Sequence, residues 1–144
     1  MKTASLVIVD QDVARAAALA AELNRQYGGQ AASGSGDVAS ATQGATGLVH
    51  ATPTGMDKLP GLPLPAALLR PDLWVSEIVY FPLETALLKA ARARGCATVD
   101  GGGMAVGQAV GAFRLFTGRE PDPARMEAHF RRLIAERQAQ EAAS

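Results

Sequence analysis

The chain has 144 residues, of which 48% are apolar and 19% charged, a composition typical of one globular domain that excludes a disordered tail or a fibrous repeat. Fourteen Lys and Arg residues balance fourteen Asp and Glu residues, and the zero net charge argues against nucleic acid and membrane surfaces as partners. The single cysteine, Cys96, excludes a disulfide framework and a cysteine-based zinc site, and no apolar run approaches the roughly 20 residues of a membrane span.

The N-terminal segment predicts a strand that leads directly into a helix. Leu6–Val9 is a continuous aliphatic run, typical of a strand buried on both faces. The run is too short for a signal peptide and closes on Asp10, so we expect a cytoplasmic protein. Asp12 can cap a helix over Val13–Tyr27, which Gly28 can end by taking a positive φ. The apolar residues of this helix recur at three- and four-residue spacing and are expected to face inward: Ala16, Leu19, Ala20, Leu23 and Tyr27.

The middle of the chain has the weakest pattern. Over residues 30–46 we expect a strand near Gln30–Ser33 and a short helix around Asp37–Gln43. Gly47–Ala51 predicts a second apolar strand. Residues 53–65 contain four prolines and two glycines, and because proline lacks the N–H that helices and sheets need, this segment is expected to form a long loop.

The C-terminal half predicts two further strands and three helices. The strands are expected at Trp74–Tyr80 and Ala97–Val99. The helices are expected at Leu83–Arg94, at Met104–Phe116 and from Asp122-Pro123 onward, and strands alternating with helices favour a parallel sheet. The last helix should turn one stripe inward (Met126, Phe130, Leu133, Ile134) and another toward water (Arg131, Arg132, Glu136, Arg137).

Three apparent motifs carry little functional weight. Gly34–Ala39 fits the dinucleotide pattern G-x-G-x-x-G/A, but the preceding Gln-Ala-Ala-Ser is a poor strand, which favours a solvated turn. His50 and His129 are far apart in the sequence and have no third ligand at metal spacing, so no metal site is predicted. Cys96 leads into an apolar strand, which favours a small buried side chain over a nucleophile.

Asp10 and the three glycines at 101–103 each allow two interpretations. An acid at the C-terminal tip of a parallel strand is where nucleotide-binding folds hold ribose hydroxyls, and the same carboxylate would repel a 2′-phosphate. Asp10 could equally cap the following helix. Gly101–Gly103 either let backbone N–H groups approach a ligand at a helix start or form a plain tight turn.

Three motifs, in this order, resemble the C-terminal part of the shikimate/quinate 5-dehydrogenase family. They are HATPTGM (His50–Met56), EIVYFPLETALL (Glu77–Leu88) and DGGGMAVGQAVGAFRLFTGREPD (Asp100–Asp122). The family usually shows N-A-T-P-x-G-M, D-x-x-Y-x-P-x-x-T-x-L-L and G-x-x-M-x-x-x-Q-x-x-x-x-F. The resemblance covers nearly the whole chain, and IVYFPLET and AFRLFTGREPD look most like the NAD-preferring quinate/shikimate branch.

The resemblance implies a role for each matching residue. The adenine ribose would be held by Asp10 and Arg15. The nicotinamide side of the cofactor would be bordered by Thr52, Pro53, Ile78, Gly101 and Met104. Tyr80 and Gln108 would contact the hydroxylated ring acid, since a phenol and an amide offer both donors and acceptors to a polyol. Tyr80 could instead be a half-buried strand aromatic, and Gln108 an exposed helix residue.

The chain departs from the family pattern in ways that bear on activity. His50 stands where the family usually has Asn, and Glu77 where it usually has Asp. The resemblance finds no counterpart of the family's N-terminal catalytic domain, with its lysine–aspartate pair, or of the first strand–loop–helix unit with its glycine-rich pyrophosphate loop. The lysines Lys2, Lys58 and Lys89 fall in no matching motif, so no catalytic residue is predicted.

We therefore expect residues 1–144 to form a partial dinucleotide-binding domain of α/β class. It would have a Rossmann-type parallel sheet with flanking helices, without the first strand–loop–helix unit, and a C-terminal helix at 121–144 that would pack on the absent catalytic domain. The resemblance implies the cofactor-binding part of an oxidoreductase that oxidises a ring CH–OH of shikimate or quinate to the 3-dehydro acid, with NAD favoured over NADP. Because this oxidation needs a base, the isolated chain is expected to be inactive. The alternative is a non-catalytic module that binds a nucleotide weakly or associates with partners.

The absent unit would leave a gap in the sheet. In the strand order 3-2-1-4-5-6, the first strand would lie between Leu6–Val9 and Leu48–Ala51. Each backbone group left buried and unsatisfied there would cost about 1–3 kcal/mol. We expect the two strands to pair directly, or a second copy of the chain to insert a strand in a homodimer, in preference to a partly folded chain.

Overall fold

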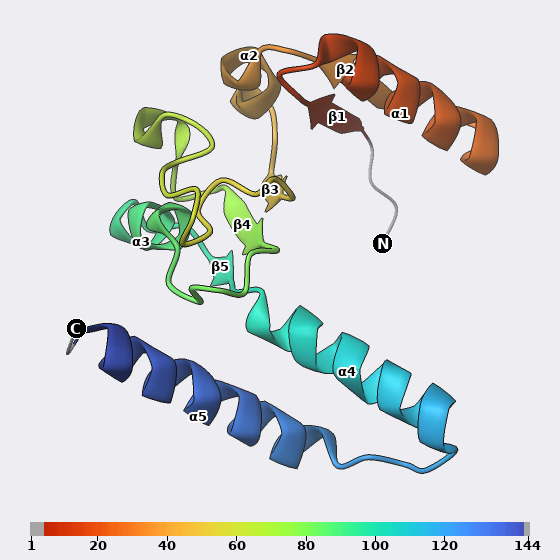
Figure 1. The fold of residues 1–144 in the computed structure, drawn as a ribbon. Coiled ribbons are helices and arrows are strands. Elements are labelled where there is room, and N and C mark those ends of the chain that lie inside the picture. Colours follow the sequence, from red (N-terminus) through yellow and green to blue (C-terminus); the bar gives the residue numbers. More distant parts are fainter. Residues whose placement is uncertain (1–4, 143–144) are drawn as a thin grey trace. The chain divides into compact units, whose positions relative to one another are not determined.

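The structure, a computed structural model, describes residues 5–142 and divides into two compact units, Met1–Ala45 and Thr46–Ser144 (Figure 1). Each unit contains parallel strands with flanking helices, which confirms the predicted α/β class. Lys2 and the last two residues of the predicted segment 121–144 lie outside the described residues. No helix within residues 5–142 has the length and apolar character needed to cross a membrane.

From residue 5 onward, the first unit contains β1 (Leu6–Val9), α1 (Val13–Tyr27), β2 (Ala32–Ser35) and α2 (Val38–Gln43), in this order. The two strands are parallel and in register from Leu6↔Ala32 to Val9↔Ser35. Helix α1 begins where the Asp12 side chain accepts the Arg15 N–H, and it ends at Gly28 with a φ of 68°. Both predicted boundaries of this helix are confirmed.

Small residues carry the packing of α1 on this sheet. Ala16 and Ala20 are buried, and a Cβ on Gly34 would lie 2.5 Å from the backbone nitrogen of Ala17. The Asn24 side chain bonds both the N–H and the C=O of Ala32, at 3.0 and 2.8 Å. This link sets where β2 starts, two residues later than the sequence predicted.

Two predictions about burial in the first unit are wrong. Strand β1 is not buried on both faces, because Leu6 and Val7 are 45% and 41% exposed in the two-stranded sheet. On α1, Leu19 and Tyr27 are exposed. The helix packs through Ala16 and Ala20, so the larger apolar side chains beside them remain at the surface of this unit.

The second unit contains β3 (Gly47–His50), a short 3₁₀ helix η1 (Ala66–Leu68), β4 (Trp74–Glu77), α3 (Ala86–Ala93), β5 (Thr98–Val99), α4 (Gly102–Thr117) and α5 (Pro123–Ala142). Its sheet is parallel, with β4 between β3 and β5. Large aliphatic side chains from the loop before β4, from β4 and from α3 form the core, with Leu69, Leu73, Val75, Leu87 and Leu88 at most 1% exposed. Cys96 is also buried, as predicted.

Two elements of the second unit are shorter than predicted, for local reasons. Strand β4 ends at Glu77 rather than at Tyr80, because the Glu77 carboxylate accepts the Val79 N–H. Helix α3 starts at Ala86 rather than at Leu83, because the Thr85 hydroxyl caps it. In both cases a side chain binds a backbone group that the longer element would have used.

Trp74, the only tryptophan of the chain, lies over a glycine of the neighbouring strand. Gly47 and Trp74 are register partners at the start of β3 and β4. A Cβ on Gly47 would lie 1.9 Å from the indole ring, so only glycine leaves room for it. The indole ring thus covers Gly47 where the two paired strands begin.

Strands β1 and β3 belong to separate sheets. Direct pairing of Leu6–Val9 with Leu48–Ala51, the first of the two arrangements expected from the sequence, would join the two units and stays a prediction. Each strand has a partner within its own unit, β1 with β2 and β3 with β4. Insertion of a strand from a second copy also stays a prediction.

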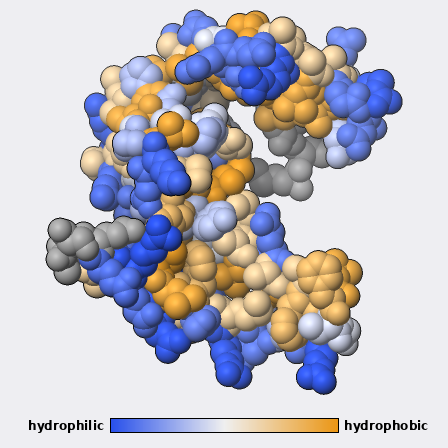
Figure 2. All heavy atoms as spheres, viewed as in Figure 1, coloured by the Kyte–Doolittle hydropathy of each residue, from blue (hydrophilic) through white to orange (hydrophobic). Residues whose placement is uncertain are grey.

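Helices α4 and α5 form a hairpin at the C-terminal end of the second unit (Figure 1). Helix α4 ends at Gly118, whose φ is 64°, and the Asp122 side chain accepts the Arg125 N–H as α5 begins. Hydrophobic surface covers the C-terminal end of α4 in the lower right of Figure 2, where Leu115 and Phe116 are more than 80% exposed.

Candidate functional site

Two ionisable side chains are buried side by side where two strands of the second unit end. The register of β3 and β4 runs to His50↔Glu77 at the carboxyl ends of both strands. His50 is 4% exposed and Glu77 is 2% exposed, and His50 Nδ1 lies 2.8 Å from Glu77 Oε1. Open parallel sheets bind their ligands at the carboxyl ends of the strands, so this pair lies at the edge where a site is expected.

Glu77 accepts hydrogen bonds from three sides. Besides His50, its Oε1 accepts the Val79 N–H at 3.0 Å, and its Oε2 accepts the Thr85 hydroxyl at 3.0 Å. Burial, the largest single influence, raises the pKa of Glu77, but these hydrogen bonds and the electrostatic interaction with His50 together hold that pKa below its ordinary value of 4.5. Glu77 is therefore an ionised acceptor at neutral pH.

The network reaches the surface through Thr52. Its Oγ1 lies 2.6 Å from His50 Nε2 and 3.4 Å from the backbone nitrogen of Thr54. Thr52 also lines a pocket of about 440 Å³ together with Ala51, Met56, Ile78, Val79, Tyr80 and Phe81. The pocket is mainly apolar and carries two polar side chains, Thr52 and Tyr80, which is typical of a small-molecule site.

Helix α5 packs on the aromatic residues of this pocket. The Tyr80 and Phe130 ring centroids are 6.5 Å apart with an interplanar angle of 56°, and the Arg137 guanidinium lies 4.0 Å above the Phe81 ring. Arg137 is exposed, as predicted, and its guanidinium is also stabilised over the aromatic face of Phe81. On the predicted apolar stripe, Leu133 is 48% exposed rather than turned inward.

Gly101 is required by the chain's own packing. A Cβ at this position would lie 2.6 Å from the carbonyl oxygens of both Ile78 and Val79. The absence of a side chain at Gly101 thus lets its backbone pack closely against the loop that follows β4. Asp100 accepts the Gly102 N–H at 2.9 Å at the start of α4, and its other oxygen lies 3.7 Å from Arg131.

In the first unit, Asp10 and Arg15 lie at the carboxyl end of β1. Asp10 Oδ1 accepts the Asp12 N–H at 2.8 Å, and its Oδ2 lies 3.7 Å from the Arg15 guanidinium. The cap of α1 is Asp12, so the interpretation of Asp10 as that cap is not supported. The Asp10 side chain is about one third exposed and Arg15 is largely exposed.

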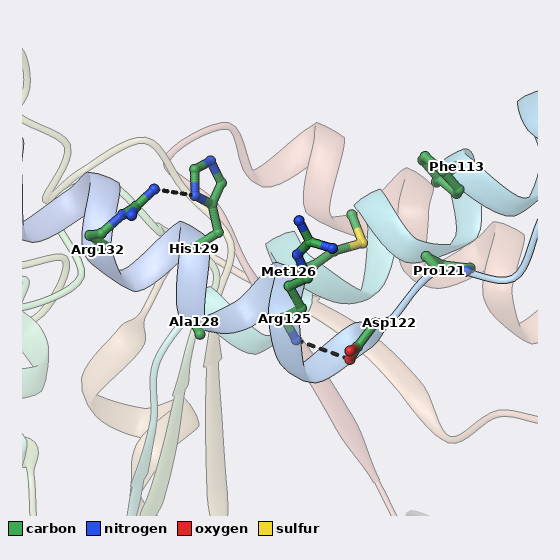
Figure 3. Close-up of a pocket in the computed structure, with 8 residues that line it drawn as sticks. All are labelled: Phe113, Pro121, Asp122, Arg125, Met126, Ala128, His129 and Arg132. Carbon is green, nitrogen blue, oxygen red and sulfur yellow. Dashed lines mark hydrogen bonds between the residues drawn. The ribbon is translucent and has the colours of Figure 1, made fainter.

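A second, larger hollow of about 740 Å³ lies along the α4–α5 hairpin (Figure 3). Phe113 and Met126 supply apolar surface, and Arg125, His129 and Arg132 lie along α5 beside it. The Arg132 guanidinium donates to His129 Nδ1 at 2.9 Å. This groove is open to solvent, and the sequence did not predict it.

The structure brings together part of the predicted set. Thr52, Ile78 and Tyr80 line one pocket, and Gly101 packs behind Ile78. Pro53 is exposed beside Thr52, Met104 is half-buried on α4, and Gln108 is exposed on the same helix. Outside that set, His50 and Glu77 were recognised in the sequence only as departures from a motif. The signal that could have found their pairing is that both motif positions change together.

The chain is similar to proteins of one family. Residues 101–129 match the family described as "Shikimate 5'-dehydrogenase C-terminal domain". The chain is 62% identical over 130 residues to a shikimate dehydrogenase (NADP(+)) of Streptomyces avermitilis, covering 89% of this chain and 45% of that protein. It is 50% identical over 127 residues to a quinate/shikimate dehydrogenase (NAD(+)) of Corynebacterium efficiens, covering 87% of this chain and 45% of that protein.

A solved structure shares the fold. Quinate dehydrogenase from Corynebacterium glutamicum, in complex with NAD, superposes with a TM-score of 0.81 at 47% identity. The superposition covers 88% of this chain and 46% of that one. The chain thus spans a little less than half the length of the relatives that it matches, and its parallel strands and helices correspond to a Rossmann-type cofactor-binding domain.

Proposed function

The chain belongs to the shikimate/quinate dehydrogenase family, of which it matches the C-terminal part, and on this premise we propose that it is the cofactor-binding part of such a dehydrogenase. The complete enzyme would oxidise a ring hydroxyl of shikimate or quinate to the 3-dehydro acid with a nicotinamide cofactor. The family as a whole includes NAD and NADP enzymes.

The pocket at the carboxyl ends of β3 and β4 is the observation that carries this proposal. It is built from two of the motifs that resemble the family, HATPTGM and EIVYFPLET, and its volume of about 440 Å³ leaves room for a pyridine ring with its carboxamide. Its apolar walls fit an uncharged ring face, and Thr52 and Tyr80 offer hydrogen bonds at its rim. The residues present therefore fit a nicotinamide group.

Each proposed residue would bind or orient rather than react. Ile78 would lie against the ring face, with Gly101 packing behind it, and Pro53 and Met104 would border the same side of the cofactor. Tyr80 and Gln108 would donate to and accept from the hydroxyls of the ring acid. The bound cofactor would accept the hydride from the ring carbon. The base that takes the hydroxyl proton belongs, in the family pattern, to the catalytic domain, so we assign no catalytic residue to these 144 residues.

Asp10 supports NAD as the preferred cofactor. Its partly exposed carboxylate lies at the tip of β1, where it could accept hydrogen bonds from ribose hydroxyls and would repel a 2′-phosphate. The neighbouring Arg15 guanidinium would assist in holding the ribose, and it is already oriented toward Asp10.

Titration of the 144-residue chain, followed by amide NMR spectra, tests the proposal. NAD should shift the amides of residues 51–56 and 78–81 with a dissociation constant on the order of millimolar, and NADP should bind more weakly. Asp10→Ser should remove that preference, whereas Asp57→Asn, which makes a similar change of charge at another exposed carboxylate, should retain it. Absence of binding of either dinucleotide would contradict the proposal. Turnover of quinate or shikimate by the isolated chain at about 1 per second or faster would show that the catalytic base lies within these 144 residues, contrary to the proposal.

A second candidate, a module whose role is association, is favoured by one observation. Phe113, Leu115 and Phe116 expose apolar surface at the end of α4, next to the open groove of Figure 3. Exposed apolar patches on soluble domains often mark contact surfaces. Light scattering during size-exclusion chromatography would support this function if the chain eluted as a dimer and Phe116→Ser returned it to a monomer.

A further inference from the structure

A continuous series of hydrogen bonds runs from the start of α3 to the rim of the pocket. The Leu88 N–H donates to Thr85 Oγ1, and the Thr85 hydroxyl donates to Glu77 Oε2. Glu77 Oε1 contacts His50 Nδ1, and His50 Nε2 contacts Thr52 Oγ1 at 2.6 Å. Among the described residues, no buried side-chain nitrogen or oxygen lacks a partner. We call this series the His50–Glu77 network.

The donor and acceptor roles within the network follow from its chemistry. An ionised carboxylate only accepts, so the hydrogen between His50 and Glu77 lies on Nδ1. In the neutral form of His50 with hydrogen on Nδ1, Nε2 can only accept, and in that form the Thr52 hydroxyl donates to it. The single hydroxyl hydrogen of Thr52 is then used, and its oxygen faces the pocket as an acceptor. The long contact of 3.4 Å from the Thr54 N–H leaves this oxygen with free accepting capacity.

We propose that His50, oriented by Glu77, is a positioning residue that fixes the Thr52 hydroxyl as a hydrogen-bond acceptor at the pocket rim, so that the pocket selects ligands that present an N–H donor. A carboxylate holds an imidazole in one tautomer in the same way in serine hydrolases. This inference rests on the proposed function, because the carboxamide N–H of a nicotinamide is the donor that would be selected. Ligands of the same shape without that N–H would be disfavoured.

The first test reads the tautomer directly, without any ligand. Side-chain ¹⁵N spectra of the 144-residue chain should show His50 as the Nδ1–H tautomer, with the signals of His129 assigned through His129→Gln. An Nε2–H tautomer at His50, or an imidazolium protonated on both nitrogens at neutral pH, would overturn the proposal. This readout depends on the direction of the hydrogen bonds, and a role of His50 confined to packing would not set it.

The second test compares ligands that differ in the carboxamide. NAD carries the N–H donor, its 3-acetylpyridine analogue replaces the amide with a methyl ketone, and ADP-ribose lacks the ring altogether. The wild-type chain should bind NAD about threefold to tenfold more tightly than the analogue, as expected for one neutral hydrogen bond. Thr52→Val should remove this preference and leave the affinity for ADP-ribose unchanged. Thr52→Ser should restore the preference, and Thr54→Val is the matched control for the same chemical change two residues along the chain.

His50→Asn separates the two links of the network. The asparagine amide can replace the Nδ1 donor to Glu77 but is too short to reach Thr52. The fold should therefore persist, while the ratio of the affinity for NAD to that for the 3-acetylpyridine analogue falls toward one. An unchanged preference in a folded His50→Asn or Thr52→Val variant would overturn the inference while leaving the proposed function standing. If neither NAD nor ADP-ribose binds, the proposed function and this inference are both wrong.

Discussion

The two units stabilise parallel strands by different means. In the first unit, α1 packs on β2 through alanine and glycine, and Leu6 and Val7 of β1 remain partly exposed. In the second unit, large aliphatic side chains fill the core, and a buried ionised residue is satisfied by three donors. Close backbone packing depends on a few atoms at short distances, whereas a filled core depends on many side chains. We expect the first unit to open more readily than the second, since it buries less apolar surface.

The largest loss of stability should come from removing the buried carboxylate of Glu77 at the end of β4. Glu77→Ala leaves His50 and the hydroxyl of Thr85 buried without their acceptor, so the free energy of unfolding should fall by about 3–5 kcal/mol. Urea denaturation, combined with amide exchange of β3–β5 and of β1–β2, would measure it. Exchange should accelerate in the second unit and stay unchanged in the first. Equal acceleration in both units would show that they unfold as one.

Adding a side-chain atom at Gly34 should destabilise the first unit selectively, with a smaller loss in the free energy of unfolding. In Gly34→Ala the new Cβ would lie 2.5 Å from the Ala17 backbone, so α1 must shift away from β2, at a cost of about 1–3 kcal/mol. Gly44→Ala is the control, because open space surrounds that position. The comparison between the units would be wrong if Gly34→Ala destabilised β3–β5 as much as β1–β2.

The cap of α1 should contribute less than the Gly34 contact. Asp12→Ala removes the acceptor of the Arg15 N–H and should cost about 1 kcal/mol of helix stability. Asp12→Asn keeps a capping oxygen and should recover most of that loss. Amide exchange in the first turn of α1 is the measurement, and equal exchange in the two variants would argue against capping as the cause.

The smallest effect is confined to acid. The pKa of Glu77 is lowered in the folded chain, so its contribution to stability is complete above its ordinary pKa of 4.5 and is lost as the pH falls through the folded value. The contribution of the Glu77 charge to the difference in stability between wild type and Glu77→Gln should be complete above about pH 4.5 and should shrink below it. Urea unfolding of both proteins at each pH would measure this difference. A difference that grows as the pH falls would contradict the assigned charge.

Sequence patterns located the elements whose boundaries are set by local chemistry. Asp12 and Gly28 define α1 because a cap and a positive φ are properties of single residues. The boundaries of β2, β4 and α3 were shifted because side chains bind backbone groups there: Asn24 binds Ala32, Glu77 binds Val79 and Thr85 binds Leu88. Such bonds depend on which residues meet after folding, and no propensity encodes them.

The candidate site was predictable to the same extent. Thr52, Ile78 and Tyr80 meet in one pocket because they follow directly after adjacent parallel strands, and the order of the motifs contains that information. The pairing of His50 with Glu77 joins residues 27 positions apart through strand register. A single sequence shows two unusual residues at these positions, and only the paired strands show that one holds the other.

The contact between Trp74 and Gly47 determines what the intrinsic fluorescence of this protein can report. Trp74, the only tryptophan, lies at the N-terminal ends of β3 and β4. The pocket lies beyond the carboxyl ends of the same strands, about 13 Å away, which is the length of a four-residue strand. Emission from Trp74 should therefore follow the pairing of these two strands and remain largely silent when a ligand enters the pocket. Tryptophan emission thus becomes an optical signal for the folding of the second unit, which can be recorded separately from ligand binding.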